Sequence, residues 1–416
     1  MSENYMSENA YPIDTSADAE AVSTIRGRLP VQTNSITNFD PDQIRQDAAD
    51  ARIIVHHKFP ALVEEFLQHK REHGSAIEKA FYGTPKTWSV EQQIARLVEE
   101  RALVFMNSDD HTLLRDGRSV SQLYKEWDRV GTDAEVTSKY LTLREYLSYD
   151  EMMLGSLLGV SGPSYFINEG RRYNAAKAGK PGTFENRGII IGLVGARFER
   201  ADRMDSVFCE PPVASPRQHH ALSTIFANCF GRRINGRRQF NHSMYKARMR
   251  ITVDLLLREA NERAKTAGKN AYVHVVGLGL GVWQVDGEQP EAYLEAFMDA
   301  LDGFGAKMQN IGTLNFAYIN VNKQTEDATK AAARPHGIDV IFSRREPAAT
   351  LPPEKKNELL VLSYAWDSNA YPGNEYWEGS LVASGDPAAA CMSTISELHN
   401  SILNPQFLSK IQVLGP

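Results

Sequence analysis

The sequence is poor in cysteine, with three among 416 residues: Cys209, Cys229 and Cys391. Their number is odd, they lie far apart and no CxxC pair occurs, so neither a disulfide framework nor a zinc ribbon is supported. A reducing compartment suits this composition, and we expect a cytoplasmic protein. An effector secreted into a host cytosol without a cleavable signal peptide would have the same composition.

An excess of basic residues is also missing. Lys and Arg total 46 against 52 Asp and Glu, which gives a net charge of −6. Because nonspecific nucleic-acid binding relies on a positive surface, we expect no nucleic-acid partner. One local stretch does hold Arg232, Arg233, Arg237 and Arg238 beside acidic segments. It indicates a local contact with a phosphate or a partner protein.

Long apolar runs are the third absence. No stretch approaches the roughly 20 residues that a membrane-spanning helix requires. The N-terminal segment MSENYMSENAYPIDTSADAEAVST has neither the basic nor the apolar region of a signal peptide. We therefore expect no membrane contact. We also expect a monomer.

The chain is long enough for two domains. Residues 1–38 are polar with almost no aliphatic side chains, and we expect them to be disordered. Residues 39–160 are expected to form a helical N-terminal region, and Ser89 and Gln92 have the spacing of a capping box. Apolar residues recur at helical spacing over 42–52, 60–73, 89–104, 120–130 and 142–158.

The apolar pattern changes over residues 161–416. Short β-branched runs occur at 188–198, 271–276, 314–321, 338–342 and 358–365, and helical patterns at 244–267, 290–304, 325–333 and 387–403. Runs of the first kind are typical of strands buried on both faces. The alternation predicts an α/β domain with a mostly parallel or mixed sheet flanked by helices. Ligands in such sheets bind where strands end, so the strand-end loops are the places to look for chemistry.

The first such loop is VVGLGLGVWQ, which holds Gly277, Gly279, Gly281, Val282 and Trp283. Alternating glycines allow a close backbone approach, so successive N–H groups can bind a diphosphate, and the indole can shield a ribose or base. The spacing is G-x-G-x-G, not the G-x-G-x-x-G of a dinucleotide fold. The alternative is a glycine-rich twist where a helix packs closely on the sheet.

The second loop follows the strand ELLVLSYA and carries Asp367, Asn369, Gly373, Asn374 and Glu375. Carboxylates can stabilise oxocarbenium-like charge and activate water, and an amide can hold hydroxyl groups. Four aromatic residues around the loop, at 366, 371, 376 and 377, predict an aromatic wall. The combination suits a sugar-nucleotide site, and the alternative is a rigid surface turn.

Asp386 follows in the motif SGDP, at the start of an expected helix. The pattern predicts first that Asp386 caps the helix, with the next residue at the first helical position, and second that it contacts ribose or takes part in catalysis. His219, His220 and His242 lack metal-ligand spacing, so we expect structural or surface roles for them and no metal site.

Two segments resemble poly(ADP-ribose) glycohydrolase-like macrodomains. LVLSYAWDSNAYPGNEYWEG with SGDPAAACMSTI resembles their signature loop, and HVVGLGLGVWQ resembles the loop that wraps the diphosphate and distal ribose. Gly373-Asn374-Glu375 replaces a glycine triplet, and Gly385-Asp386-Pro387 replaces paired glutamates. The Asn-containing loop comes last here and first in usual macrodomains, so the resemblance implies a macrodomain-like sheet with a permuted strand order.

A closer resemblance, over residues 160–403, is to the atypical macrodomain ADP-ribosylhydrolases that include the Legionella effector MavL. It rests on SYFINEGRRYN, RGIIIGLVGARFE and the two loops. It implies removal of ADP-ribose from a modified side chain, with arginine as the residue and ubiquitin as the protein substrate. No cofactor is implied, since ADP-ribose is ligand and product.

The resemblance assigns roles to the candidate residues. The loop 277–283 would bind the diphosphate, Asn369 would hold the distal ribose, and Asp367, Glu375 and Asp386 would surround its anomeric carbon. Which carboxylate is acid or base depends on burial and mutual distance. Two other hypotheses remain: an ADP-ribose or NAD reader without turnover, favoured by the altered turn at 373–375, and a Rossmann-like dinucleotide enzyme, which lacks the fingerprint.

Overall fold

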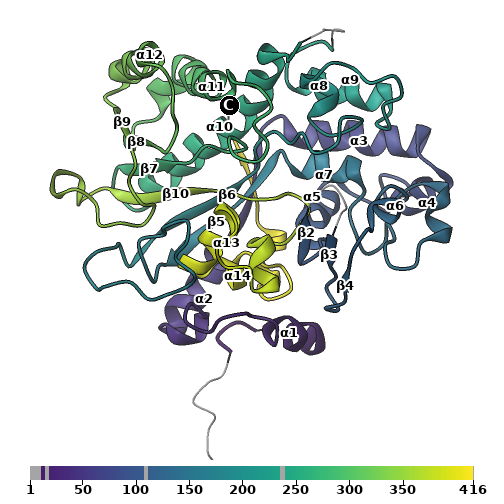
Figure 1. Ribbon diagram of the computed structural model, residues 1–416, viewed down its shortest axis with the longest axis horizontal. Coiled ribbons are helices and arrows are strands. Elements are labelled where there is room, and N and C mark those ends of the chain that lie inside the picture. The colour runs from purple at the N-terminus through teal and green to yellow at the C-terminus, as the bar shows by residue number, and fades with distance from the viewer. Residues whose placement is uncertain (1–10, 15–17, 107–110, 235–238, 416) are drawn as a thin grey trace, which may run out of the picture.

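A mixed α/β architecture surrounds an eight-stranded sheet (Figure 1). The computed structural model describes residues 11–14, 18–106, 111–234 and 239–415. The strands follow the order β11-β1-β5-β6-β10-β7-β8-β9 across the sheet. Their bounds are β1 (Arg52–His56), β5 (Leu158–Tyr165), β6 (Arg187–Leu193), β7 (Ala271–Val275), β8 (Ile311–Ala317), β9 (Asp339–Ser343), β10 (Leu359–Ala365) and β11 (Ile411–Leu414). The predicted α/β class is confirmed.

The five strands predicted from continuous apolar runs form one parallel block. β6, β10, β7, β8 and β9 pair in parallel with their neighbours, so their carboxyl ends share one edge of the sheet. β5 runs antiparallel between β6 and β1, and β11 pairs in parallel with β1. Most side chains of β6, β7, β8 and β10 are buried on both faces, as expected of strands with helices on either side. Those of β9, at the edge of the sheet, are half-buried or exposed.

Helices cover the two faces of the sheet (Figure 1). On one face α10 (His242–Thr266) contacts seven strands, β1, β5–β8, β10 and β11; α11 (Gln289–Phe304) and α12 (Lys323–Ala333) continue this layer. On the other face, α2 (Pro41–Asp50) packs on β5 and α13 (Gly385–Met392) on β10. The helix expected over 387–403 ends early, and the short α14 (Ile395–Leu398) follows.

Most of the other helices lie beside the sheet, on the side away from β9 (Figure 1). They are α3 (Phe59–His73), α4 (Ala76–Tyr82), α5 (Val90–Glu99), α6 (Tyr124–Trp127), α7 (Tyr149–Gly155), α8 (Ser206–Cys209) and α9 (His220–Cys229), with a small sheet of β2 (Val104–Met106), β3 (His111–Leu113) and β4 (Ser119–Val120). The capping box predicted for Ser89 and Gln92 opens α5. Residues 39–160 thus contain α2 to α7 together with the strands β1 to β4.

Two expectations about chain organisation differ from the structure. Described residues from 18 to 38 are folded: α1 (Ala19–Arg26) is capped by Asp18, and Ile36 is fully buried in a small apolar cluster. Asn34 donates to Ala390 O and Ser393 O, so contacts distant in sequence order this polar segment. β1 belongs to the region expected to be helical, yet it pairs with β5 in the main sheet. The boundary expected at residue 160 therefore does not separate a helical region from the sheet.

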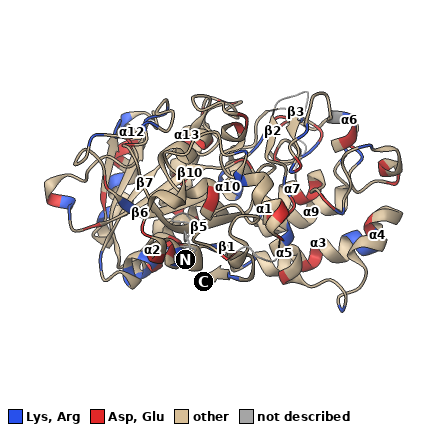
Figure 2. Ribbon diagram, turned by 90° about the horizontal axis from the view of Figure 1, so that it is seen from below, with Lys and Arg blue, Asp and Glu red and all other residues tan. Residues whose placement is uncertain are grey.

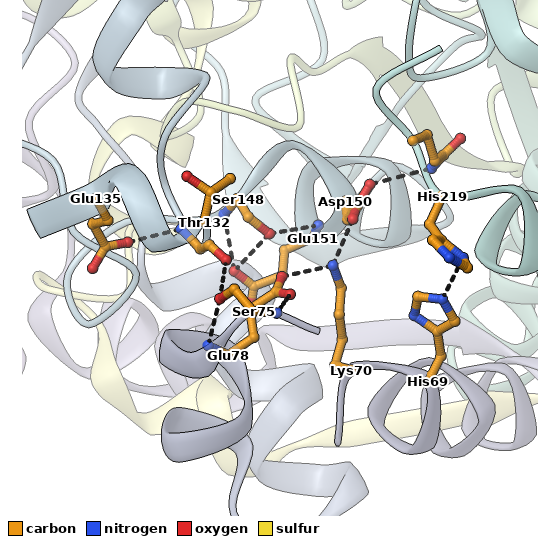
Figure 3. Close-up of polar contacts among 12 residues, drawn as sticks. His69, Lys70, Ser75, Glu78, Thr132, Glu135, Ser148, Asp150, Glu151 and His219 are labelled. Atoms are coloured by element: carbon orange, nitrogen blue, oxygen red, sulfur yellow. Dashed lines mark hydrogen bonds and ion pairs between the residues drawn. The ribbon is translucent and has the colours of Figure 1, made fainter. Parts of the chain in front are cut away.

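A buried polar network joins α3, α4 and α7 (Figure 3). Lys70 Nζ lies 2.6 Å from Glu78 Oε1 and 2.5 Å from Asp150 Oδ2. Burial disfavours the charged amine, but the two carboxylates outweigh it and raise the pKa of Lys70. At the other end of this network, His69 Nε2 and His219 Nδ1 are 3.0 Å apart. Since a buried charge is tolerated only with partners, the network fixes the position of α7.

Surface charge is mixed. Lys and Arg are interspersed with Asp and Glu over the helices rather than gathered on one side of the molecule (Figure 2). In the part of the chain that the structure describes, no helix combines the length and apolarity needed to cross a bilayer.

Candidate active site

Three loops meet at the carboxyl edge of the sheet because three neighbouring strands end there. β6 and β7 flank β10 in parallel, and Leu193 pairs with Ala365 at the last rung. Trp366 N continues the ladder by donating to Leu193 O at 2.9 Å. The loop after β6 also lies against the glycine loop after β7: a Cβ on Gly195 would come 2.6 Å from Gly279 N. Residues far apart in sequence thus form one site.

The C-terminal loop holds its carboxylates by specific hydrogen bonds. Asn374 Nδ2 donates to Asp367 Oδ2 at 2.8 Å, and Gly373 N donates to Asp386 Oδ1 at 2.8 Å. Ser384 Oγ lies 3.4 Å from Glu375 Oε2. The loop and the start of α13 therefore bring together the three carboxylates that the sequence singled out.

The protonation of these carboxylates is set by their surroundings. Burial raises the pKa of Asp367 to about 7; Arg197 opposes this rise, and the negative charges of Glu375 and Glu199 add to it. Burial and the charge of Asp367 raise the pKa of Asp386 well above its ordinary value. Burial also raises the pKa of Glu375. All three pKa values are thus raised, and that of Asp367 lies near neutral pH, where a carboxyl can exchange a proton in acid–base chemistry.

Asp386 differs from its first expectation. α13 begins at Gly385 with Ser384 as its N-cap, so Asp386 lies inside the first turn and does not cap the helix. Its side chain turns toward the loop, because Gly373 N supplies a hydrogen bond there. Its Oδ2 is buried without a hydrogen-bond partner among the described residues. A buried carboxyl oxygen without a partner is the kind of group that a ligand can satisfy.

Asn369 and Asn374 have different surroundings. The side-chain oxygen of Asn369 is buried and has no hydrogen-bond partner in the described part of the chain. The side chain of Asn374 is engaged within the protein: it accepts from Phe105 N at 3.0 Å and donates to Asp367. Asn369 therefore keeps capacity for a ligand, whereas Asn374 ties the loop to β2.

The aromatic residues expected to wall the loop lie beneath it instead. Trp366, Tyr371, Tyr376 and Trp377 are at most 3% exposed and belong to the main core. The indole of Trp366 donates to Ala370 O at 3.0 Å within the loop. Aromatic burial thus stiffens the loop, and no wall of exposed rings is formed by these four residues.

The glycine loop after β7 is shaped by close packing. Gly279 has φ +76°, and a Cβ there would lie 3.1 Å from Ala196 O. Gly277 faces the side chain of Leu280, a Cβ on Gly281 would meet nothing within 4 Å, and Val282 is 86% exposed. The alternative interpretation placed a closely packed helix against these glycines. The structure instead places the loop after β6 there. Because nothing packs against Gly281, the backbone of the glycine loop is accessible at that residue.

Arg197 is a site residue that the sequence analysis did not single out. Its guanidinium is buried, pairs with both oxygens of Glu199 at 2.7 and 2.6 Å, and lies 4.7 Å from the ring centre of Trp283. Trp283 Nε1 also donates to Glu199 Oε1 at 3.0 Å. Trp283 is 6% exposed, so it packs in this cluster rather than standing free to cover a base. The cluster links the glycine loop to Asp367 by charge.

The site rests on α7 from below. Ser368 Oγ donates to Met152 O at 3.2 Å, and Arg248 Nη2 donates to Ser156 O at 3.0 Å and to Gly195 O at 3.2 Å. Since the network around Lys70 fixes α7, the first turn of the C-terminal loop has a rigid support. A supported carboxylate beside a second carboxyl with a raised pKa can position and activate a water molecule.

The remaining residues that the sequence singled out are arginines and histidines away from the three loops. Arg237 and Arg238 lie outside them. His219 accepts from Ala221 N at the start of α9, and His242 lies 2.8 Å from Asp286, so both have the structural contacts expected of them.

Comparison with known proteins gives consistent matches along the chain. A family model described as ADP-ribosylhydrolase MavL-like matches residues 27–219 and 216–413. Two Drosophila melanogaster proteins, both named ADP-ribosylarginine hydrolase, are 34% and 32% identical over 409 and 404 residues. Each alignment covers 88% of this chain and 78% of the relative.

Proposed function

Because this chain belongs to the MavL-like ADP-ribosylhydrolase family, we propose that it hydrolyses the bond between ADP-ribose and an arginine side chain of a modified protein. One observation supports the site assignment above all. Asp367 and Asn369 follow β10 at the sheet edge where ligands of α/β proteins bind, and Asp386 is held against the same loop by Gly373 N; both carboxyls have raised pKa values. The relatives support arginine as the modified residue.

The proposed reaction breaks the N-glycosidic bond at the anomeric carbon of the distal ribose. Asp367, ionised, accepts a proton from water while the water oxygen bonds to that carbon. The electron pair of the broken C–N bond stays on the guanidine nitrogen, which takes up the proton, so atoms and charge balance. A pKa of about 7 suits this role, since a base works best near the operating pH.

The other two carboxyls complete the proposed mechanism. Asp386, protonated, donates from its free oxygen to a ribose hydroxyl, and Gly373 N holds its second oxygen. Glu375, half-buried, supplies negative charge to the oxocarbenium-like transition state. Asn369 holds a ribose hydroxyl through the side-chain oxygen that lacks a partner.

We extend the proposal to the binding mode. ADP-ribose would lie as in macrodomains, with its diphosphate over the backbone of the glycine loop near Gly281 and its distal ribose over Asp367. The open position of Gly281 supports this placement. The resemblance to a family with a ubiquitin-directed member supports ubiquitin modified at arginine as one protein substrate.

The test is release of ADP-ribose from a panel of proteins, each modified through arginine, serine, glutamate or cysteine. Ubiquitin modified at arginine and a second arginine-modified protein are both included. Chromatography should detect free ADP-ribose from the arginine substrates alone. Tight ADP-ribose binding without release from any substrate would refute the hydrolase activity. The protein would then be a binding module that recognises ADP-ribose without turnover. Release from the second arginine-modified protein but not from ubiquitin would refute ubiquitin as a substrate and leave the reaction intact.

A further inference from the structure

A cavity outside the candidate active site is lined by basic residues. It has a volume of about 430 Å³ and lies between the loop after β1, the middle of α10 and the end of α11. Its charged lining comprises Lys58, Arg232, Lys246, Arg250, Arg258 and Lys307 with Asp254 and Asp299. Six cations against two carboxylates is a local excess of positive charge in a chain whose net charge is −6.

Helix geometry explains how α10 contributes to this cavity. Lys246, Arg250, Asp254 and Arg258 recur every four residues and therefore lie along one stripe of the helix. Arg248 lies on the opposite side, where it contacts Gly195 O and Asp205. The helix thus separates the cavity from the candidate active site, and none of the carboxylates of that site lines it.

The cations of the cavity are only partly neutralised. Lys246 pairs with Glu295 and Asp299 at 3.2 and 3.3 Å, and Arg250 pairs with Asp254. Arg258 has a buried Nε without a hydrogen-bond partner among the described residues, and its guanidinium lies 4.1 Å from the ring centre of Phe304.

The other basic side chains lie at the rim. Lys58, Arg232 and Lys307 are exposed there, and each belongs to a different segment of the chain. The part of the chain that the structure describes gives none of these three a salt bridge to a carboxylate. Several cations thus converge from separate elements and keep hydrogen-bonding capacity.

We propose that this cavity binds a small multivalent phosphate, of the pyrophosphate or nucleoside-polyphosphate class. Its volume is within the range of about 300–1,000 Å³ that small-molecule sites occupy. Guanidinium groups match the oxygens of phosphate in pairs, and ammonium groups add charge at the rim. Arg232 belongs to the basic stretch for which the sequence predicts a local contact with a phosphate or a partner protein. The site is independent of the proposed hydrolase reaction.

The test is isothermal titration of the full chain with pyrophosphate at physiological salt. The wild type should bind one equivalent at the cavity. Lys58→Gln with Lys307→Gln, both at exposed positions, should weaken that binding at least about tenfold. Adding Arg258→Gln to these two substitutions should weaken pyrophosphate binding further. Lys265→Gln, an exposed residue on the same helix outside the cavity, is the matched control and should change affinity less than about twofold.

Three results would overturn the proposal. Absence of pyrophosphate binding by the wild type would do so, as would binding retained in the Lys58/Lys307 variant, which would place the ligand elsewhere. A poly-glutamate peptide that binds at the same residues more tightly than pyrophosphate would assign the cavity to an acidic protein segment instead. Hydrolysis of ADP-ribose-arginine should persist in all of these variants, so failure of this proposal is distinguishable from failure of the hydrolase.

Discussion

Replacement of Asp367 by Asn should strongly reduce turnover and stabilise the fold at neutral pH. The carboxyl has a pKa of about 7 in the folded chain, against an ordinary value of 3.8. Between these two pH values the folded state binds more protons at this group than the unfolded state does. The free energy of unfolding therefore falls as pH rises from about 4 to 7, because ionised Asp367 destabilises the folded state.

The structure sets the size of this effect. A rise of about three pKa units corresponds to a cost of about 4 kcal/mol once Asp367 is ionised. The residue is half-buried, and contact with solvent reduces the expected gain from Asp367→Asn to about 1–3 kcal/mol at pH 8. At pH 4 the gain should be near zero. The amide can still accept from Asn374, so the hydrogen bond within the loop is kept.

The assay is urea unfolding of the wild type and the variant at several values between pH 4 and 8. Asp302→Asn, at an exposed position near the end of α11, is the matched control and should show no such pH-dependent gain. In parallel, ADP-ribose release by Asp367→Asn should fall by about 10²- to 10⁴-fold. A variant less stable than the wild type at pH 8, or a stability difference that is the same at pH 4 and 8, would refute the electrostatic reasoning.

Three further predictions follow from the same contacts. Gly279→Val should weaken ADP-ribose binding, because the residue has φ +76° and its side chain would press on the facing loop; calorimetry with unchanged affinity would contradict this. Lys70→Met should lower the free energy of unfolding by about 3–5 kcal/mol in urea, because two carboxylates lose their cation, while the exposed Lys79→Met changes it by less than about 0.5 kcal/mol. Wild-type activity should rise with pH through about 7, and Arg197→Met should move that rise to higher pH, because the cation lowers the pKa of Asp367; an unshifted profile would count against this charge coupling.

The sequence predicts the parallel half of the sheet well and the antiparallel half poorly. β6, β7 and β10 are nearly continuous apolar runs, and their burial on both faces is predictable from the residues themselves. β5 reads LGVSGPSY, whose Gly, Ser and Pro give no strand pattern, and it exists because β1 and β6 pair with it. β1, RIIVH, follows a helix directly and is too short to stand out from it.

The candidate site divides in the same way. The loop with Asp367 is predictable because it follows the apolar strand β10 directly in sequence. Arg197 is not, since an arginine after a strand resembles a surface residue until Glu199 and Trp283 are seen to bury it. The contact of Asp386 with Gly373 N depends on how α13 docks on the loop, and local capping preferences point elsewhere. Local pattern indicates where the chemistry lies, and tertiary contacts decide which groups share it.

We propose that this chain cleaves ADP-ribose from arginine with the carboxylates of the C-terminal loop. The most direct measurement is the single-turnover rate of ADP-ribose release from an arginine-modified protein by the wild type, Asp367→Asn, Asp386→Asn and the control Asp302→Asn. We expect release by the wild type and the control, and a loss of at least about 10²-fold in the two loop variants, all four being folded. Equal rates in all four, or no release by the wild type, would contradict the account.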